Sequence, residues 1–307
     1  MEPRNQALLA LLLRSGKKIS AQKTLAVLKD PAITNIQFTP RGVNEIIHRY
    51  SLSDTDVTQK ECDASKVLYE EHINQKILVI DVASSDYPKH LRAIKDAPPI
   101  LFVKGNIDAI ETTPGVAVVG ARASTRAGTE ISRRVSRFLS ENGWVVVSGL
   151  ALGVDAAAHR GCIEGGSPTI AVLASGLHEA TPKQNAGLAQ EILANGGAWV
   201  SEHPLGVPPL RNHFIPRNRI QMGLSAGSII VEAGKKSGSM TQARLCRAQN
   251  RALFAVIPES EANPLQLNCE GTLSIVDDPN FGATPIKSKT DYPRVLEILR
   301  NERLLLT

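Results

Sequence analysis

The clearest pattern in the chain is a series of short apolar runs separated by amphipathic stretches, between Val116 and Pro258. The runs predict strands at 116–119, 145–147, 169–173, 198–201, 228–231 and 253–257, and the stretches predict helices at 129–140, 153–163, 185–193, 219–223 and 241–249. Apolar strands that alternate with helices are typical of a parallel sheet covered on both faces. We therefore predict an α/β fold with a doubly wound, mostly parallel, Rossmann-like sheet, which would bind ligands at the carboxyl ends of its strands.

The segments on either side have other patterns. Residues 1–75 carry aliphatic residues at helical spacing, interrupted by glycines and prolines, which predicts a small N-terminal domain of three or four helices. We place the Rossmann-like domain at 76–285, with entry strands at 77–80 and 100–103 and a possible late strand at 272–276. Residues 286–307 are predicted to form a tail with one helix, too short for a winged helix.

Composition narrows the class of protein. The 307 residues carry a formal net charge of +5, which is compatible with a polyanionic partner but is weak evidence alone. The four cysteines are far apart and form no C-x-x-C pair, so we expect no metal, no cofactor and a reduced, cytoplasmic protein. No apolar run reaches transmembrane length, which predicts no membrane association.

Three predicted strands end in a turn of small residues that opens a helix. These turns contain Gly120 with Arg122, Ser148 with Gly149, and Gly238. Free backbone N–H groups at a helix start attract anions, phosphate above all. A lone glycine turn often binds nothing, and the first turn lacks the G-x-G-x-x-G pattern and the acidic residue of NAD sites. Because parallel strands end at one edge of a sheet, the turns together predict a phosphate pocket.

A basic segment lies next to the last of these turns in the chain. It contains Phe214, Arg217, Asn218 and Arg219. Guanidinium groups suit phosphate oxygens, and an exposed aromatic ring suits the face of a base. The alternative is that Phe214 belongs to the core and the arginines to a solvated rim.

The helix after the third turn extends the positive charge. Lys236 precedes it, and Arg244, Arg247 and Arg251 have the i, i+3, i+7 spacing of one helical face. The stretch 233–258 contains no acidic residue. A solvated face is the ordinary explanation, but the absence of acids favours an anionic partner.

Asp155 and His159 are the candidates for acid–base chemistry. They lie four residues apart, on one face of the predicted helix. A structural, hydrogen-bonded pair is the stronger expectation, and Asp155 could also cap the helix. We therefore predict no catalytic residue.

The motifs VAVVGAR (116–122), VVSGLALGVDAAAH (146–159), HFIPRNRIQMGLS (213–225) and VEAGKKSGSMTQA (231–243) follow one another in order. Together with the entry segment from Tyr87 they resemble the DprA/Smf family of DNA-processing proteins of natural transformation. The resemblance implies single-stranded DNA binding, dimerisation and transfer of the DNA to the RecA recombinase, without catalysis. It implies that the pocket is lined by Gly120, Arg122, Ser148, Gly149, Arg217, Asn218, Arg219 and Gly238, with Phe214 stacked on a base.

Departures from that pattern keep alternatives open. Ala121 stands where the family usually has serine, and Glu259 stands where it has glycine after Pro258. The chain could be a divergent relative with a task such as phage defence. It could be a nucleotide sensor, or an N-glycosidase similar to the related LOG-type enzymes. The segment 236–243 lacks the glutamate of those enzymes, although Glu202 and Glu232 lie near strand ends.

Overall fold

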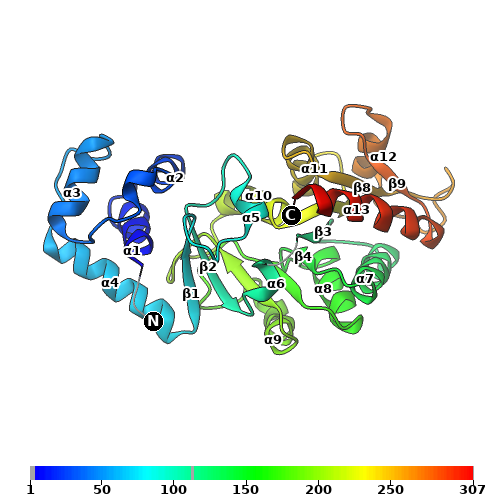
Figure 1. The fold of residues 1–307 in the computed structure, drawn as a ribbon. Helices are drawn as coiled ribbons and strands as arrows, with labels where there is room; N and C mark the ends of the chain where they lie inside the picture. The colour runs from blue at the N-terminus through cyan, green and yellow to red at the C-terminus, as the bar shows by residue number, and fades with distance from the viewer. Residues whose placement is uncertain (1–3, 112–113, 307) are drawn as a thin grey trace.

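One sheet forms the centre of the molecule (Figure 1). A computed structural model describes residues 4–111 and 114–306. In these residues the sheet contains nine strands, in the order β1 (Ile77–Asp81), β2 (Ile100–Gly105), β6 (Ala198–Ser201), β5 (Thr169–Val172), β4 (Val146–Ser148), β3 (Gly115–Val119), β7 (Ser225–Ile230), β8 (Ala252–Val256) and β9 (Thr284–Ile286). The strands from β6 to β9 in this order are parallel, and β1 and β2 form an antiparallel edge. The predicted mostly parallel, Rossmann-like fold class is confirmed.

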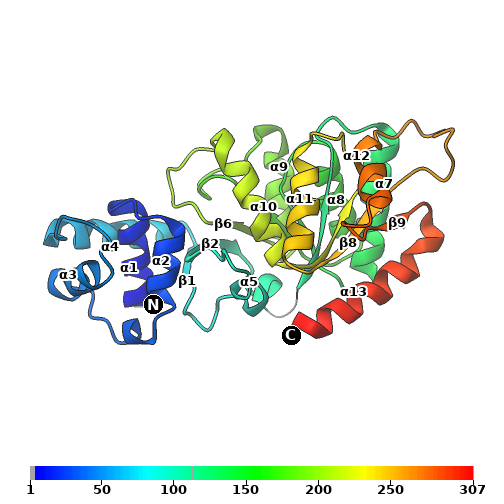
Figure 2. The ribbon, with the colours of Figure 1, turned by 90° about the horizontal axis from the view of Figure 1, so that it is seen from above.

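Helices cover both faces of the sheet (Figures 1 and 2). One face packs against α7 (Arg126–Glu141), α8 (Val154–Glu164) and α13 (Tyr292–Leu306). The other packs against α10 (Phe214–Gly223), α11 (Gly238–Ala248) and α12 (Glu270–Asp277), and α9 (Ala186–Ala194) packs against β5 and β6. Successive side chains of a strand point to opposite faces, so Val116 and Val118 of β3 join the first core while Ala117 and Val119 join the second.

The N-terminal helices pack beside the β1 edge (Figure 1). They are α1 (Asn5–Leu11), which continues as a π-helical turn at Leu12–Gly16, then α2 (Ala21–Leu28), α3 (Pro40–Arg49) and α4 (Gln59–Asn74). Their buried leucines form one apolar cluster with β1, β2, β5 and β6. The predicted domain boundary at 75/76 stays a prediction, because the N-terminal helices share a core with the sheet. Residues 1–3 and 307, at the ends of the two outer predicted domains, lie outside the described residues.

Shorter helical segments occupy the connections. They are α5 (Lys89–Arg92), α6 (Asp108–Glu111) and the 3-10 turns Pro31–Ile33, Lys183–Asn185, Arg211–His213 and Lys289–Asp291.

The structure corrects the prediction most after Val256. The strand predicted at 272–276 is wrong, because this segment lies in α12 and buries Thr272 and Ile275 on one helical face. The predicted boundary at 285/286 falls inside β9, a short edge strand that the sequence analysis missed. The expected tail helix is α13, and it packs on the sheet through buried aliphatic side chains.

Candidate functional site

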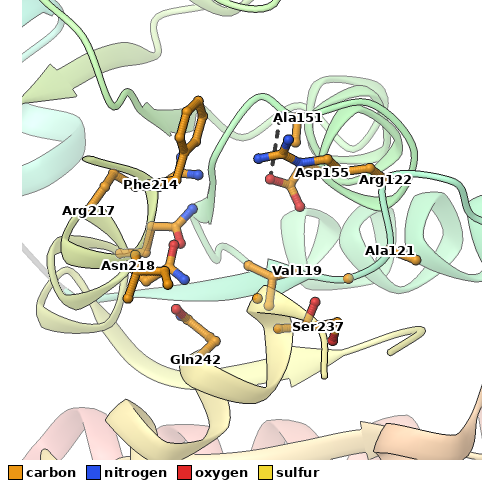
Figure 3. Close-up of a pocket in the computed structure, with 15 residues that line it drawn as sticks. Val119, Ala121, Arg122, Ala151, Asp155, Phe214, Arg217, Asn218, Ser237 and Gln242 are labelled. Carbon is orange, nitrogen blue, oxygen red and sulfur yellow. Dashed lines mark hydrogen bonds between the residues drawn. The ribbon is translucent and has the colours of Figure 1, made fainter. Parts of the chain in front are cut away.

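The largest concentration of predicted site residues lies where the strand order reverses, between β3 and its neighbours β4 and β7. A cavity of about 300 Å³ opens there at the carboxyl end of β3. Ligands of doubly wound sheets bind at this place. The predicted residues that line it are Gly120, Arg122, Phe214, Arg217, Asn218 and Gly238 (Figure 3).

The first and second turns are packed against each other. Gly153 has a positive φ of 75°, and a Cβ there would lie 2.5 Å from the carbonyl oxygens of Ala121 and Arg122. The Val154 N–H donates to the Ala121 oxygen at 3.2 Å. Glycine is therefore required at 153 by both the backbone conformation and the contact with the first turn.

Ser148 and Gly149 support the cavity from beneath. The buried Ser148 hydroxyl donates to the Val118 carbonyl oxygen at 2.7 Å. A side chain on Gly149 would collide with the guanidinium group of Arg217. Neither residue lines the cavity, so the structure gives them a supporting position and not the predicted pocket contact.

Carboxylates accept hydrogen bonds from backbone donors at or beside two of the three turns. Glu232 accepts from the Thr125 N–H and hydroxyl at the start of α7, both at 2.9 Å. Asp155 accepts from the N–H groups of Gly149, at 3.1 Å, and Ala151, at 3.4 Å. These donors therefore have anionic partners inside the protein, which makes them poor phosphate ligands.

The third turn differs from the other two. Ser237 is the N-cap of α11, but its side chain makes no capping hydrogen bond, and the first turn of the helix contains no acidic residue. Ser237, Gly238 and Ser239 all line the cavity. An uncapped helix N-terminus that faces a cavity is a good place for an anion, because its N–H groups and its dipole point toward the ligand.

Arg122 and Phe214 lie at the entrance to the cavity. Arg122 is exposed and Phe214 is half-buried. The guanidinium carbon of Arg122 is 5.1 Å from the centre of the Phe214 ring, which is a cation–π contact (Figure 3). A positive group and an aromatic face are thus available together at the cavity mouth.

The two arginines of the basic segment have different environments. Arg217 is only 6% exposed, and it donates to the Val172 carbonyl oxygen. Burial lowers the pKa of Arg217 to about 10, and the charge of Asp155 opposes that shift. Burial in turn raises the pKa of the Asp155 carboxyl, and the charge of Arg217 opposes it. Arg217 thus lines the cavity as a buried cation whose charge interacts with that of Asp155.

Arg219 points away from the cavity. Its two terminal nitrogens donate to the Glu202 carboxylate at 2.6 and 2.7 Å, and its Nε donates to the Asp96 carbonyl oxygen at 2.8 Å. Burial alone would raise the pKa of Glu202, but the bonds and charge of Arg219 outweigh it and hold this pKa below its usual value. The predicted position of Arg219 in the phosphate pocket is corrected: it holds the β6 end against the entry segment.

The remaining basic residues do not form the predicted face. Lys236 and Arg244 are exposed and lie outside the cavity lining. Arg251 follows α11, is buried, and donates to the His90 carbonyl oxygen at 3.2 Å, so it does not share a surface with Arg244. Lys236 and Arg244 remain available only to a ligand that extends beyond the cavity.

The Asp155–His159 pair is not formed. The buried His159 ring is hydrogen-bonded through Nδ1 to the Thr169 hydroxyl at 2.7 Å. Burial lowers the pKa of His159 to about 3, with a further contribution from the charge of Arg217. His159 is therefore a neutral core residue, and Asp155 serves the second turn instead.

The cavity is also lined by polar residues that the sequence analysis did not select, namely Gln221, Ser237, Ser239 and Gln242. Gln242 stands in the segment 236–243, where the lack of a carboxylate was noted. The amides themselves gave no signal, because a glutamine in a helix is usually solvated. Over the described residues, no group of three or more His, Cys, Asp or Glu side chains is placed to hold a metal ion. No helix in this part of the chain has the length and apolar character needed to cross a membrane.

Comparison with known proteins gives a consistent family. Residues 78–295 match the family model described as DNA recombination-mediator protein A. The chain is 40% identical over 200 residues to the Smf protein of Escherichia coli, which covers 65% of this chain and 52% of that protein. It is 41% identical over 195 residues to the DNA processing protein DprA of Streptococcus pneumoniae, covering 64% and 68%. The matched region is thus about half the length of the Escherichia coli protein.

Solved structures agree. The X-ray structure of DprA from Streptococcus pneumoniae has a TM-score of 0.74 and 30% identity, and covers 96% of this chain and 98% of that one. DprA from Helicobacter pylori, described for its single-stranded DNA binding mode, has a TM-score of 0.63 and 29% identity, covering 72% and 96%. The first likeness extends over the N-terminal helices as well as the sheet.

Proposed function

Because the chain belongs to the DNA recombination-mediator protein A family, we propose that it binds single-stranded DNA at the cavity beside β3. The observation that carries this proposal is the α11 N-terminus, which faces the cavity and has neither a side-chain cap nor an acidic residue in its first turn, whereas Glu232 accepts from Thr125 at the start of α7 and Asp155 lies in the first turn of α8. One backbone phosphate would bind at Gly238 and Ser239, opposite Arg122. The Helicobacter pylori relative is described as a single-stranded DNA binder, which supports the assignment.

Phe214 supplies the aromatic part of the interaction. Its ring is half-buried at the cavity mouth and is covered on one side by Arg122. An unpaired base could stack on this ring, which contributes roughly 1–3 kcal/mol per base by alanine substitution. Exposed Lys236 and Arg244 would contact neighbouring phosphates of a longer strand.

We further propose that binding occurs without catalysis. The carboxylates near the strand ends have other partners: Glu202 pairs with Arg219, and Glu232 and Asp155 accept backbone N–H bonds. Loss of a base from a nucleotide would need a carboxylic acid or carboxylate free to act at the sugar. Incubation with AMP should therefore release no adenine.

The proposed biological role takes its support from the relatives. We propose that this cytoplasmic protein acts as a homodimer that protects incoming single strands and transfers them to the RecA recombinase during natural transformation. The names of the relatives, which are DNA-processing proteins, support this role. Measuring RecA filament formation on DNA coated by a single-strand-binding protein, with and without this protein, tests the transfer step.

A nucleotide sensor is the second candidate, and the small size of the cavity favours it. About 300 Å³ is at the lower end of the range for small-ligand sites. Affinities for a mononucleotide and for a long oligonucleotide separate the two functions. DNA binding predicts that the oligonucleotide binds much more tightly and with a strong salt dependence.

A further inference from the structure

A second cavity, of about 840 Å³, lies at the other end of the sheet. Its walls come from α2, the segment 93–97 after α5, the end of α11 and the end of α13. Both ribbon views show α5 close to the C-terminal end of α13 (Figures 1 and 2). Residues 249–251 also line it, just before the start of β8, whereas the cavity beside β3 opens at the carboxyl ends of the parallel strands. We call this second cavity the α2–α11 cavity.

The lining of the α2–α11 cavity includes a buried cation with free hydrogen-bond donors. Arg251 is only 5% exposed. Its Nη2 donates to the His90 carbonyl oxygen at 3.2 Å, but neither Nε nor Nη1 has a hydrogen-bond partner among the described residues. No carboxylate of the described chain forms an ion pair with this guanidinium group. Because a buried charge is costly unless it is paired, such a group in a cavity indicates an anionic ligand.

The residues around Arg251 do not neutralise its charge. Burial lowers the pKa of Arg251, and the charge of Glu302 on α13 opposes this shift from a distance. Burial lowers the pKa of His90 to about 4, with a further contribution from the charge of Arg251, so His90 is neutral near pH 7. The other acidic side chain in the lining, Asp96, lies 3.5 Å from Arg219 Nε. The positive charge of Arg251 therefore has no counterion of its own.

The walls of the α2–α11 cavity are largely apolar. Four separate elements contribute their side chains, which are Leu25, Ile94, Leu245, Ala248 and Leu306. Guanidinium donors suit both carboxylate and phosphate oxygens. A bare inorganic anion would leave the apolar walls in contact with water, whereas an anion on an apolar body would cover them. The volume is within the range of roughly 300–1,000 Å³ that is usual for small-molecule sites.

We propose that the α2–α11 cavity binds an amphipathic organic anion, whose carboxylate or phosphate group pairs with Arg251 while its apolar part packs against α2 and α11. The inference does not depend on the proposed binding of single-stranded DNA, because the two cavities lie at opposite ends of the strands. Since α2 forms one wall, the ligand would also hold the N-terminal helices against the sheet.

Octanoate is the probe for this site, because it carries a carboxylate on an apolar chain. Two further compounds are its matched controls: 1-octanol keeps the chain without the charge, and acetate keeps the charge without the chain. Monooctyl phosphate changes only the head group, and therefore distinguishes a carboxylate site from a phosphate site. Isothermal titration calorimetry on the full chain measures the affinity for each compound below its micelle concentration. The melting temperature is followed in parallel.

The expected result depends on both parts of the ligand. The wild type should bind at least one of the two octyl anions, which should raise its melting temperature, and should bind 1-octanol and acetate at least about tenfold more weakly. Arg251→Met should weaken binding of the octyl anion by about tenfold or more, because hydrogen bonds between charged groups are the strong ones. Arg247→Met is the matched control variant, since Arg247 is an exposed arginine of α11 outside the cavity lining, and it should bind like the wild type.

A stability measurement separates ligand binding from a structural role. Because Arg251 has no counterion in the free protein, Arg251→Met should leave the melting temperature without ligand unchanged or raise it. If Arg251→Met does not fold, Ala248→Trp fills the cavity from the exposed end of α11 and should abolish binding of the octyl anions. No binding of either octyl anion to the wild type, or equal affinity in Arg251→Met, would overturn the inference. Arg251→Met should keep the wild-type affinity for single-stranded DNA, and a loss of that affinity would also overturn the inference.

Discussion

The ion pair between Arg219 and Glu202 offers the sharpest test of the corrected site. Both side chains are about nine-tenths buried, with 9% and 10% of their surfaces exposed, and two hydrogen bonds join them. Glu202→Gln keeps the volume and removes the charge, which leaves the Arg219 cation buried without its main partner. Breaking a buried pair in this way typically costs about 3–5 kcal/mol.

The structure places this variant at the low end of that range. The Asp96 carboxylate lies 3.5 Å from Arg219 Nε, but it is 60% exposed and can replace only part of the lost interaction. We therefore expect the free energy of unfolding to fall by about 3 kcal/mol. Glu130→Gln is the matched control, because Glu130 pairs with Arg133 and Arg134 at the surface. Exposed pairs contribute about 0–1 kcal/mol.

Urea unfolding, followed by circular dichroism, measures both variants. The midpoint of Glu202→Gln should decrease clearly without a change in m-value, whereas Glu130→Gln should resemble the wild type. Under conditions where Glu202→Gln is folded, its affinity for single-stranded DNA and its salt slope should be unchanged. If Glu202→Gln loses less than about 1 kcal/mol of stability, or if its salt slope is weaker, the structural role of Arg219 is refuted. Either result would support the predicted position of Arg219 in the DNA site.

Further predictions concern the cavity and the core. Arg122→Ala should leave the melting temperature unchanged, weaken oligonucleotide binding several-fold and reduce the salt slope by about 0.7, the value for one phosphate contact on a single strand. Arg217→Met should instead lower the melting temperature, because it removes the positive charge that opposes the effect of burial on the Asp155 carboxyl; a melting temperature equal to that of the wild type would contradict this. Gly149→Ala should displace the Arg217 guanidinium and lower the urea midpoint, which a crystal structure of the variant can check. His159 has a pKa of about 3 in the folded protein against about 6.5 when unfolded, so its contribution to stability is complete above pH about 6.5 and is lost as the pH falls toward 3. His159→Gln should therefore weaken the pH dependence of the urea midpoint over this interval, and an unchanged dependence would count against the assignment.

The sequence predicted the central sheet well because its strands have strong patterns. The continuous apolar runs of β3, β5 and β6 have the length of strands, and Gly120 marks the end of β3. The strand predicted at 272–276, in the segment of α12, is wrong because the local pattern there is misleading. Its β-branched residues favour a strand locally, but Thr272 and Ile275 lie on one face of a helix that packs against the second core.

The error over Arg219 came from the predicted start of its helix. The sequence analysis began that helix at 219, whereas α10 begins at Phe214 and includes both arginines. Residues two apart on a helix do not share a face, so Arg217 and Arg219 cannot both point into the cavity. With the correct helix start, the sequence would have predicted that Arg217 and Arg219 point in different directions.

Contacts between residues that lie far apart in the chain could not be predicted from the sequence. Glu232 accepts a hydrogen bond from the Thr125 N–H at the start of α7, although the two residues are 107 positions apart. No sequence pattern near either residue predicts this contact. The three small-residue turns therefore look equivalent in the sequence. Only the folded chain distinguishes the two that are closed by carboxylates from the one at α11 that is open.

The most direct test of the central claim is a salt titration of binding to single-stranded and duplex oligonucleotides of equal length. If the α11 N-terminus and Arg122 hold a backbone phosphate while an unpaired base stacks on the Phe214 ring, the single strand must bind more tightly. Its affinity must fall linearly with salt on logarithmic axes, and Arg122→Ala must reduce the slope. Equal affinity for the two forms, or a slope that Arg122→Ala does not change, would contradict the account.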